Sequence, residues 1–381
     1  MEYLKGKSYL KRCFAQIHLD RLGKNIKNYI DYSGAKEICC VVKADAYGHC
    51  VSAVAPYLQD KLGIRWFAVS NASEAVDLRE MGIKGEILIL ASTPVNGISL
   101  LKEHNLITTV PSLEYAKTLS ENGGGRVHIK LDTGMSRIGL DIKNATEQIK
   151  EIKKLENISV EGIFTHLCVA DSADEEDVAF TKNQIAAFKK VVEECKECGI
   201  EFSYKHFLNS AGGIYHYDSE SDLVRLGITQ YGLLPNAELS CPFEIEPVMD
   251  FKAVVTQVKY IEKGDTVSYG RTFTAKSRMK VATVSVGYAD GYFRAFSNCG
   301  KVLINGKFAN IIGRVCMDQM MIDVTDIEVS AGDVATLFGK GLSADEIALS
   351  INTIGYELIC AVSKRVPRVI YLDDKEIADF V

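Results

Sequence analysis

The chain has 381 residues, of which 47% are hydrophobic and 25% charged, so it carries enough apolar mass for a large core. Its formal net charge is −6 with both signs interspersed, and the absence of a long Lys/Arg run argues against a nucleic-acid partner. No apolar stretch approaches the roughly 20 residues of a membrane-spanning helix, so we expect a cytoplasmic protein without a membrane segment.

The N-terminal stretch MEYLKGKSYLKRCFAQIHL contains basic residues but lacks the apolar centre of a secretory signal. Several of the 11 cysteines lie in apolar runs, as Cys39 and Cys40 do, which is typical of small buried side chains in a reducing compartment. Cys195 and Cys198 form a C-x-x-C pair. Because the pair closes an amphipathic helix pattern, we interpret it as helical sequence rather than a redox or zinc site, and we expect no metal.

Short apolar runs alternate with helical patterns over the first two thirds of the chain. Most are apolar throughout, as strands covered on both faces are. The expected strands are 38–42, 66–70, 86–91, 107–110, 127–131, 162–166, 205–208 and 223–228. Helix patterns lie between them, for example at 112–125 and 179–199. Strands and helices alternating over about 220 residues predict a TIM-type (β/α)8 barrel at 12–246, with an open doubly wound sheet as the alternative.

After Pro247 the pattern changes to closely spaced strands separated by glycine-containing turns. The runs are DFKAVVTQVKYI, KVATVSVGYA, GKVLINGKFANIIGRV and DVATLFGK, with one helix pattern near 343–352. The sequence therefore predicts an α/β protein in which the barrel is followed by a mostly β C-terminal domain. We assign 247–381 to that domain, together with residues 1–11.

Lys43 directly follows the first expected strand, in the stretch EICCVVKADAYGHC. Chemistry in a parallel barrel occurs at the C-terminal ends of the strands. A solvated lysine is the simplest interpretation, but this one lies between an apolar run and an alanine-rich turn that holds Tyr47 and His49. A partly desolvated lysine has a lowered pKa and can form a Schiff base.

The ends of the later strands carry further polar side chains. They are Lys130, Asp132, Arg137, His166, His206, Asn209, Ser210 and Arg225. Ser210 and the pair Gly227–Ile228 would contact a phosphate at the last strands of the barrel. The two histidines could equally be buried core residues with satisfied hydrogen bonds or catalytic residues. A buried guanidinium at Arg225, in contrast, needs a partner, because it lies in an apolar strand. A lysine, a phosphate site and convergent arginines together suggest pyridoxal phosphate as cofactor.

Nine sequence blocks, in order, resemble the alanine racemase family over nearly the whole chain. The blocks are VVKADAYGH, KLDTGMSRIGL, FTHL, NSAG, VRLGI, VSYGRTF, VGYADGY, GRVCMDQ and YELICAVSKRVPR. The resemblance implies a pyridoxal phosphate barrel followed by a β domain, in a head-to-tail homodimer with shared active sites. It also implies interconversion of L- and D-alanine, which supplies D-alanine for peptidoglycan.

The resemblance also implies a role for each matching residue. Lys43 would bind the cofactor aldehyde and act as a base on one face of Cα, while Tyr269 from the partner chain would act on the other face. Racemisation needs two such groups, because one face loses a proton and the other receives one. Free tyrosine and lysine have pKa values of about 10 and 10.4, so both need tuning by burial or cationic neighbours. The expected phosphate contacts are Tyr47, Ser210, Gly227, Ile228 and Tyr356.

The remaining roles concern the ring of the cofactor and the substrate. Arg225 would face the pyridine nitrogen; a protonated arginine donates a hydrogen bond but no proton, which disfavours transamination. Arg137 would contact the ring hydroxyl and the substrate carboxylate, oriented by a carbamylated Lys130, and His166 would tune the tyrosine. Met317 of the partner chain would offer its backbone N–H to the substrate, and Tyr288 would line the entrance.

Three positions depart from the family pattern. Asp45 and Cys50 replace the usual Asn and Gly of the lysine motif, and Gly355 replaces the Asn before Tyr356. The alternative function is a serine racemase, or a dual alanine and serine racemase, of the glycopeptide-resistance type. A hydrophobic pocket rejects an added hydroxyl only weakly, by roughly 10²-fold. A non-catalytic cofactor carrier would lack Tyr269, and a decarboxylase would carry an acidic residue where Arg225 stands.

Overall fold

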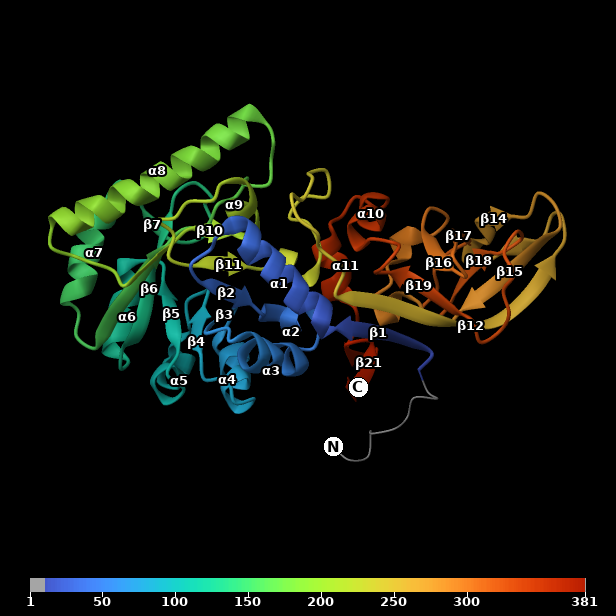
Figure 1. Ribbon diagram of the computed structural model, residues 1–381, viewed down its shortest axis with the longest axis horizontal. Coiled ribbons are helices and arrows are strands. Elements are labelled where there is room, and N and C mark those ends of the chain that lie inside the picture. Colours follow the sequence, from blue (N-terminus) through green and yellow to red (C-terminus); the bar gives the residue numbers. More distant parts are fainter. Residues whose placement is uncertain (1–10, 381) are drawn as a thin grey trace.

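The computed structural model describes residues 11–380 as two parts arranged along one long axis (Figure 1). Residues 1–10, which the sequence assigned to the C-terminal domain, lie outside this range. Within it, no helix has both the length and the apolar composition needed to cross a membrane. The first part is an α/β structure, and the second is dominated by strands, so the predicted order of fold types is confirmed.

The first part contains a parallel sheet in the order β10-β11-β2-β3-β4-β5-β6-β8-β9, with β7 paired to β6. Its strands are β2 (Ile38–Val41), β3 (Trp66–Val69), β4 (Glu86–Ile89), β5 (Ile107–Val110), β6 (Gly125–Asp132), β7 (Leu140–Asp141), β8 (Ile158–Phe164), β9 (Tyr204–His206), β10 (Leu208–Asn209) and β11 (Val224–Leu226). Each expected strand corresponds to one of these, or to the pair β9 and β10.

The sheet closes into a barrel because its two ends belong to one interrupted strand. Only Phe207 separates β9 from β10, and these two segments are the two ends of the sheet order. The open-sheet alternative is therefore wrong. Every residue of β2, β3 and β5 is buried, as expected for strands covered on both faces.

Helices follow the strands, and the longer ones form the outer layer of the barrel (Figure 1). They are α1 (Leu19–Ser33), α2 (Lys43–Gly48), α3 (Val51–Leu62), α4 (Ala72–Glu80), α5 (Ile98–Glu103), α6 (Leu113–Glu121), α7 (Ala145–Lys154), α8 (Glu175–Glu197) and α9 (Ser210–Tyr215), with short 3-10 turns η3 (Val95–Gly97) and η4 (Ile228–Tyr231). Cys195 lies inside α8 and Cys198 caps its end, and both are free thiols, so the helical interpretation of the C-x-x-C pair is confirmed.

The second part is built on a nine-stranded sheet in the order β15-β18-β17-β16-β19-β12-β1-β20-β21. Its strands are β1 (Cys13–His18), β12 (Met249–Ile261), β15 (Met279–Val284), β16 (Lys301–Ile304), β17 (Lys307–Ile312), β18 (Met320–Asp323), β19 (Val334–Phe338), β20 (Arg368–Leu372) and β21 (Lys375–Phe380). β12 also pairs with β15, which closes the first six strands of this order into a ring. The helices α10 (Ala344–Leu349) and α11 (Gly355–Ala361) lie on the side that faces the barrel (Figure 1).

Strand β1 joins the second part, although the sequence assigned residues from 12 onward to the barrel. β1 pairs antiparallel with β12 and parallel with β20. The chain thus starts in the C-terminal sheet and returns to it after the barrel. The division at residues 246 and 247 stays a proposal.

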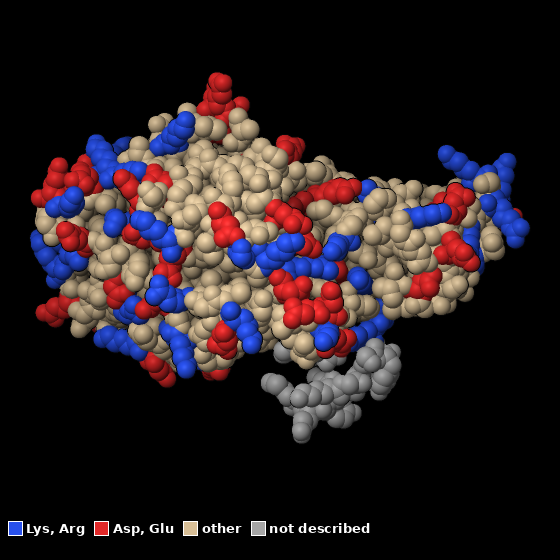
Figure 2. Space-filling view, viewed as in Figure 1, with Lys and Arg blue, Asp and Glu red and all other residues tan. Residues whose placement is uncertain are grey.

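A small hairpin, β13 (Thr266–Val267) with β14 (Phe273–Thr274), extends from the second part and encloses the turn η5 (Tyr269–Arg271). Two further 3-10 turns, η6 (Tyr288–Asp290) and η7 (Arg294–Phe296), complete the elements of this part. Figure 2 shows acidic and basic side chains interspersed over the visible face of the barrel part, with basic side chains gathered at the far tip of the second part. The mixed charge agrees with the modest net charge of the sequence.

Candidate active site

A cavity of about 650 Å³ lies at the C-terminal ends of the barrel strands. Asp132 and His206, which the sequence also placed at the strand ends, do not line it. It gathers the barrel residues expected to bind the cofactor or to act in catalysis, together with Tyr356 of α11. These are Lys43, Tyr47, Lys130, Arg137, His166, Ser210, Arg225, Gly227, Ile228 and Tyr356. The position agrees with the location of active sites in barrel enzymes.

Lys43 and Tyr47 belong to a left-handed helical turn. The four residues from Ala44 to Tyr47 have φ between 52° and 55°, and ψ between 40° and 52°. Side chains four residues apart share one face of such a turn, so Lys43 and Tyr47 both reach the cavity, and Lys43 Nζ lies 6.0 Å from the centre of the Tyr47 ring. Non-glycine residues avoid this conformation, and where it persists at a functional site the surroundings must impose it.

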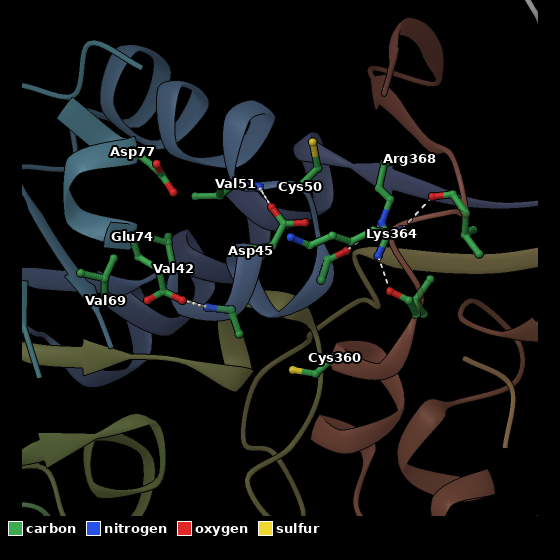
Figure 3. Close-up of a pocket in the computed structure, with 14 residues that line it drawn as sticks. Val42, Asp45, Cys50, Val51, Val69, Glu74, Asp77, Cys360, Lys364 and Arg368 are labelled. Atoms are coloured by element: carbon green, nitrogen blue, oxygen red, sulfur yellow. Dashed lines mark hydrogen bonds between the residues drawn. The ribbon is translucent and has the colours of Figure 1, made fainter. Parts of the chain in front are cut away.

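Hydrogen bonds from three sides hold this turn, and Figure 3 shows them around Asp45, Glu74 and Arg368. Glu74 accepts from the backbone N–H of Ala44 at 2.8 Å with one oxygen and from that of Ser70 at 2.7 Å with the other. Asp45 accepts from the N–H of Val51, at the start of α3, at 2.7 Å. Arg368 of β20 donates to the carbonyl of Gly48 at 3.1 Å.

Position 48 of this turn requires glycine for steric reasons. Gly48 has φ of 79°, and a β-carbon there would lie 2.5 Å from the carbonyl oxygen of Ile359 on α11. No other residue meets both demands without moving α11. The turn that carries Lys43 is therefore packed directly against the C-terminal part.

The cavity lowers the pKa of Lys43. Burial is the main cause, and the positive charge of Arg137 adds to it. A lysine of lowered pKa is a better nucleophile and base near neutral pH. Cys360 of α11, an exposed thiol, also lines this cavity.

Hydroxyl and amide groups converge at one end of the cavity. The backbone N–H of Gly227 donates to Ser210 Oγ at 2.9 Å. A β-carbon on Gly227 would lie 3.1 Å from Tyr47 Oη and 3.7 Å from Ser210 Oγ, so the glycine leaves the space between these groups open. The buried hydroxyl of Tyr29 donates to the Ser210 carbonyl at 3.0 Å and fixes this segment. Groups of this kind match the acceptor oxygens of a phosphate.

Arg225 is buried at another end of the cavity, with 3% of its surface exposed. Its guanidinium donates to His206 Nδ1 at 2.9 Å and to the Thr165 carbonyl at 2.8 Å, and lies 3.3 Å from His166 Nδ1. It takes part in none of the ion pairs of the described residues. Burial lowers the pKa of Arg225 to about 10, so it stays charged at neutral pH with neutral partners only.

A chain of histidines extends from Arg225 into the barrel interior, because His206 Nε2 lies 2.9 Å from His128 Nδ1. A guanidinium can only donate, so His206 Nδ1 accepts and its proton lies on Nε2. That proton is donated to His128 Nδ1, which leaves the His128 proton on the buried Nε2, an atom with no partner among the described residues. Burial keeps both rings neutral, lowering the pKa of His128 to about 3 and that of His206 well below 6.5.

Lys130 lies beside Arg225 with 3% of its surface exposed. Its Nζ donates to the Leu131 carbonyl at 2.5 Å. Burial, reinforced by the charge of Arg225, lowers the pKa of Lys130 to about 7. A substantial fraction of this amine is thus neutral at physiological pH, in contrast to an ordinary lysine.

Three of the expected site residues do not line the cavity. Tyr269, Tyr288 and Met317 belong to the C-terminal part and are 72%, 43% and 53% exposed. They lie close together, because the N–H of Tyr288 donates to the Cys316 carbonyl at 3.0 Å, and Ser268 donates to the Arg314 carbonyl at 2.7 Å. One chain therefore presents two separate groups of residues.

A buried carboxylate supports the second group. Asp290, fully buried, accepts from Arg12 at 2.5 Å, from Arg365 at 2.8 Å and from the N–H of Gly287 at 2.9 Å. Arg365 also donates to Asp318, the neighbour of Met317, at 2.6 Å. This network ties the turns of Tyr288 and Met317 to each other.

Several residues that hold the lining of the cavity in place could not be recognised from the sequence. Glu74 comes three residues after Asn71, a spacing typical of helix N-termini, and its N–H bonds the Asn71 side chain. Its carboxylate, however, accepts from the N–H groups of Ala44 and Ser70 rather than from that of Asn71. Arg368 and His128 act through partners far away in the chain, for which the sequence offers no local indication. Among the described residues no three His, Cys, Asp or Glu side chains gather in a way that could hold a metal ion.

The fold and the cavity define a two-domain barrel enzyme with a lysine, a phosphate-type cradle and a buried arginine at the strand ends. The comparison with known families is specific: residues 17–235 match the N-terminal domain of alanine racemase, and residues 248–370 match its C-terminal domain. The chain is 40% identical to alanine racemase from Clostridium novyi, covering 97% of each, and 40% identical to that from Methanococcus maripaludis, covering 93% of this chain and 98% of the other.

Solved structures agree with the sequence comparison. The alanine racemase of Clostridium difficile 630 is 35% identical with a TM-score of 0.91, covering 97% of this chain and 98% of that one. The alanine racemase of Bacillus anthracis with bound L-Ala-P is 32% identical with a TM-score of 0.90, covering 97% of each chain. The chain belongs to the alanine racemase family of isomerases, which depends on pyridoxal phosphate.

Proposed function

We propose that this chain interconverts L- and D-alanine with pyridoxal phosphate, as a homodimer in which each active site takes residues from both copies. The observation that carries the proposal is the convergence, in one barrel cavity, of Lys43 with a lowered pKa, the Ser210–Gly227 cradle and the buried Arg225. The names of the relatives support alanine as substrate.

The residues of the cavity fit the cofactor. Tyr47, Ser210, Gly227 and Ile228 would hold its phosphate, because hydroxyl and amide donors surround the space that Gly227 leaves open. Lys43 would bind its aldehyde from the turn that also supplies Tyr47. When bound, pyridoxal phosphate supplies an electron sink for the negative charge that develops at Cα.

The two proton-transfer groups would lie on opposite faces of Cα. Lys43 Nζ would take or return the proton on one face, and Tyr269 Oη of a second copy would do so on the other. The 72% exposure of Tyr269 in a single chain supports this arrangement, because a proton donor needs a partly desolvated site that the second copy would provide. Met317 and Tyr288 of that copy would complete the substrate site from the same surface.

Arg225 would limit side reactions. Its pKa of about 10 keeps it protonated, so it would donate a hydrogen bond to a ring nitrogen but cannot readily give it a proton. A bound ring that receives no proton from Arg225 would take up less negative charge, which would favour return of the proton to Cα over transamination. Arg137 would bind the substrate carboxylate, and a carbamylated Lys130 would orient it; a pKa of about 7 leaves Lys130 partly in the neutral form that reacts with carbon dioxide.

Serine is the alternative substrate, and Tyr356 bears on the choice. Its ring borders the cavity with its centre 6.3 Å from that of Tyr47, which leaves less room for a hydroxymethyl group than a smaller side chain would. We therefore propose alanine as the preferred substrate. D-alanine from this reaction would serve peptidoglycan synthesis.

Exchange of the Cα proton from D₂O, together with racemisation of both alanine enantiomers, tests the function. Lys43→Ala should lose the visible absorbance of the lysine-bound cofactor and all activity, whereas Lys102→Ala, an exposed lysine of α5, should keep both. Tyr269→Phe should abolish racemisation, and Tyr260→Phe, another exposed tyrosine of the same domain, should not. If Tyr269→Phe racemises at the unchanged rate in both directions, the two-base assignment is wrong.

A further inference from the structure

Helix α11 separates the catalytic turn from helix α10. It carries Gly355 and Tyr356 at its start, and it packs on α10 on one side and on α2, the turn of Lys43 and Tyr47, on the other (Figure 1). Tyr356 lines the cavity. Any shift of α11 along the line from α10 to α2 therefore changes the width of the cavity beside Tyr356.

Asp345, in the first turn of α10, fills the space next to Gly355. A β-carbon on Gly355 would overlap Asp345 Oδ1 and come within 2.5 Å of Leu233 Cδ2. The backbone of Gly355 thus approaches the carboxylate as closely as only glycine allows. This is the position where the family usually has asparagine.

The other oxygen of Asp345 binds a second segment that lines the cavity. Asp345 Oδ2 accepts from the backbone N–H of Leu234 at 3.1 Å. Leu234 directly precedes Pro235, which lines the same cavity as Tyr356. One carboxylate therefore contacts the segments that carry both Pro235 and Tyr356.

Stability alone does not account for this carboxylate. Asp345 makes no ion pair among the described residues, and burial raises its pKa to about 6. A carboxyl group that loses hydration without a charged partner destabilises the fold. The contacts of Asp345 with the segments of Gly355 and Leu234 point to a role in geometry instead.

We propose that Asp345, admitted by Gly355, is a positioning residue that sets the spacing between Tyr356 and Pro235 and so determines the discrimination between the methyl of alanine and the larger side chain of serine. The inference deepens the proposed racemase function and rests on it. A side chain at position 355 would push α11 off α10 and towards α2, which narrows the cavity. Removal of the Asp345 carboxylate would let α11 settle towards α10, which widens it.

The test compares kcat/KM for alanine and for serine in Gly355→Ala, Asp345→Ala and the double variant. Gly355→Ala should lower the serine-to-alanine ratio by about tenfold, the effect of roughly one methylene of misfit. Asp345→Ala should raise the ratio several-fold. In the double variant the ratio should return towards that of the unchanged enzyme, because the new β-carbon then meets only the flexible end of Leu233. Glu346→Ala, which removes an exposed carboxylate of the same helix turn that pairs with Lys301, should leave the ratio unchanged.

The outcomes separate this inference from the proposed function. If the unchanged enzyme racemises no amino acid, the proposed function is wrong and the inference falls with it. If the enzyme racemises alanine but the ratio stays within twofold in all three variants, while melting temperatures shift, Asp345 has a structural role only and the inference alone is wrong. Should Gly355→Ala not fold, Asp345→Ala decides, since an unchanged ratio in that variant overturns the inference.

Discussion

The left-handed turn that carries Lys43 leads to a quantitative prediction about Glu74. Four non-glycine residues in this conformation cost roughly 4–8 kcal/mol relative to the right-handed helical conformation. The contacts that impose the turn must therefore offset this conformational free energy. Glu74 contributes two hydrogen bonds from one carboxylate, to the N–H groups of Ala44 and Ser70. Both of its oxygens therefore act as acceptors.

Glu74→Gln changes this site without changing its volume. A glutamine can accept from only one of the two N–H groups and turns its own amide donor towards the other. The loss of one charge-assisted hydrogen bond, with a donor left facing a donor, costs about 2 kcal/mol. For a domain of this size that lowers the melting temperature by roughly 4–8 °C. Because Ala44 is the neighbour of Lys43, we also expect kcat to fall by at least about tenfold.

Thermal unfolding, monitored by circular dichroism, measures the change in melting temperature, and racemisation rates measure the change in kcat. Glu80→Gln is the matched control, because it makes the same chemical change at the exposed last residue of the same helix. The expectation is that Glu80→Gln changes neither quantity. A Glu74→Gln variant with the melting temperature and kcat of the unchanged protein would show that the turn does not depend on this carboxylate.

Three other predictions follow from buried charged or titratable groups. The pKa of Asp345 is raised from 3.8 to about 6, so the stability that protonation confers is lost as pH rises through this window; Asp345→Asn should melt higher than the unchanged protein at pH 8, and the difference should vanish near pH 4. His128 and His206 should stay neutral, each protonated on Nε2, and a ¹⁵N NMR titration between pH 5 and 8 that moves either ring would contradict this tautomer chain. Asp290→Asn leaves two arginines without their shared carboxylate; we expect a melting temperature lower by several degrees and a raised KM for alanine, and an unchanged KM would separate Asp290 from the substrate site.

Much of the barrel could be predicted because its strands are apolar throughout and its helices separate them regularly. The strand β1 could not, because CFAQIH resembles any short alternating strand, and its partners at Met249–Ile261 and Arg368–Leu372 lie more than 200 residues away. The pairing of such segments is decided by tertiary packing rather than by local sequence. β20 was missed for the same reason, because it pairs with the distant β1.

Lys43 could be singled out as a candidate from its place after a buried strand, but the conformation of its turn could not be predicted. Asp45 was unexplained in the sequence; in the structure its carboxylate caps the N-terminus of α3 at Val51, a role that the usual asparagine can also fill. Cys50 adopts φ of 68° where the family usually has glycine, and its thiol lies 3.2 Å from Ser52 Oγ. Nothing in the structure explains why cysteine rather than glycine stands there.

The separation of Lys43 from Tyr269 within one chain has a genetic consequence under the proposed dimer. A Lys43→Ala subunit keeps an intact Tyr269, and a Tyr269→Phe subunit keeps an intact cavity, so a mixed dimer of the two contains one complete site and one that lacks both groups. Two inactive alleles can then complement each other when expressed together. With random assortment, about half of the dimers are mixed, and each mixed dimer has one complete site. About a quarter of all active sites are then complete.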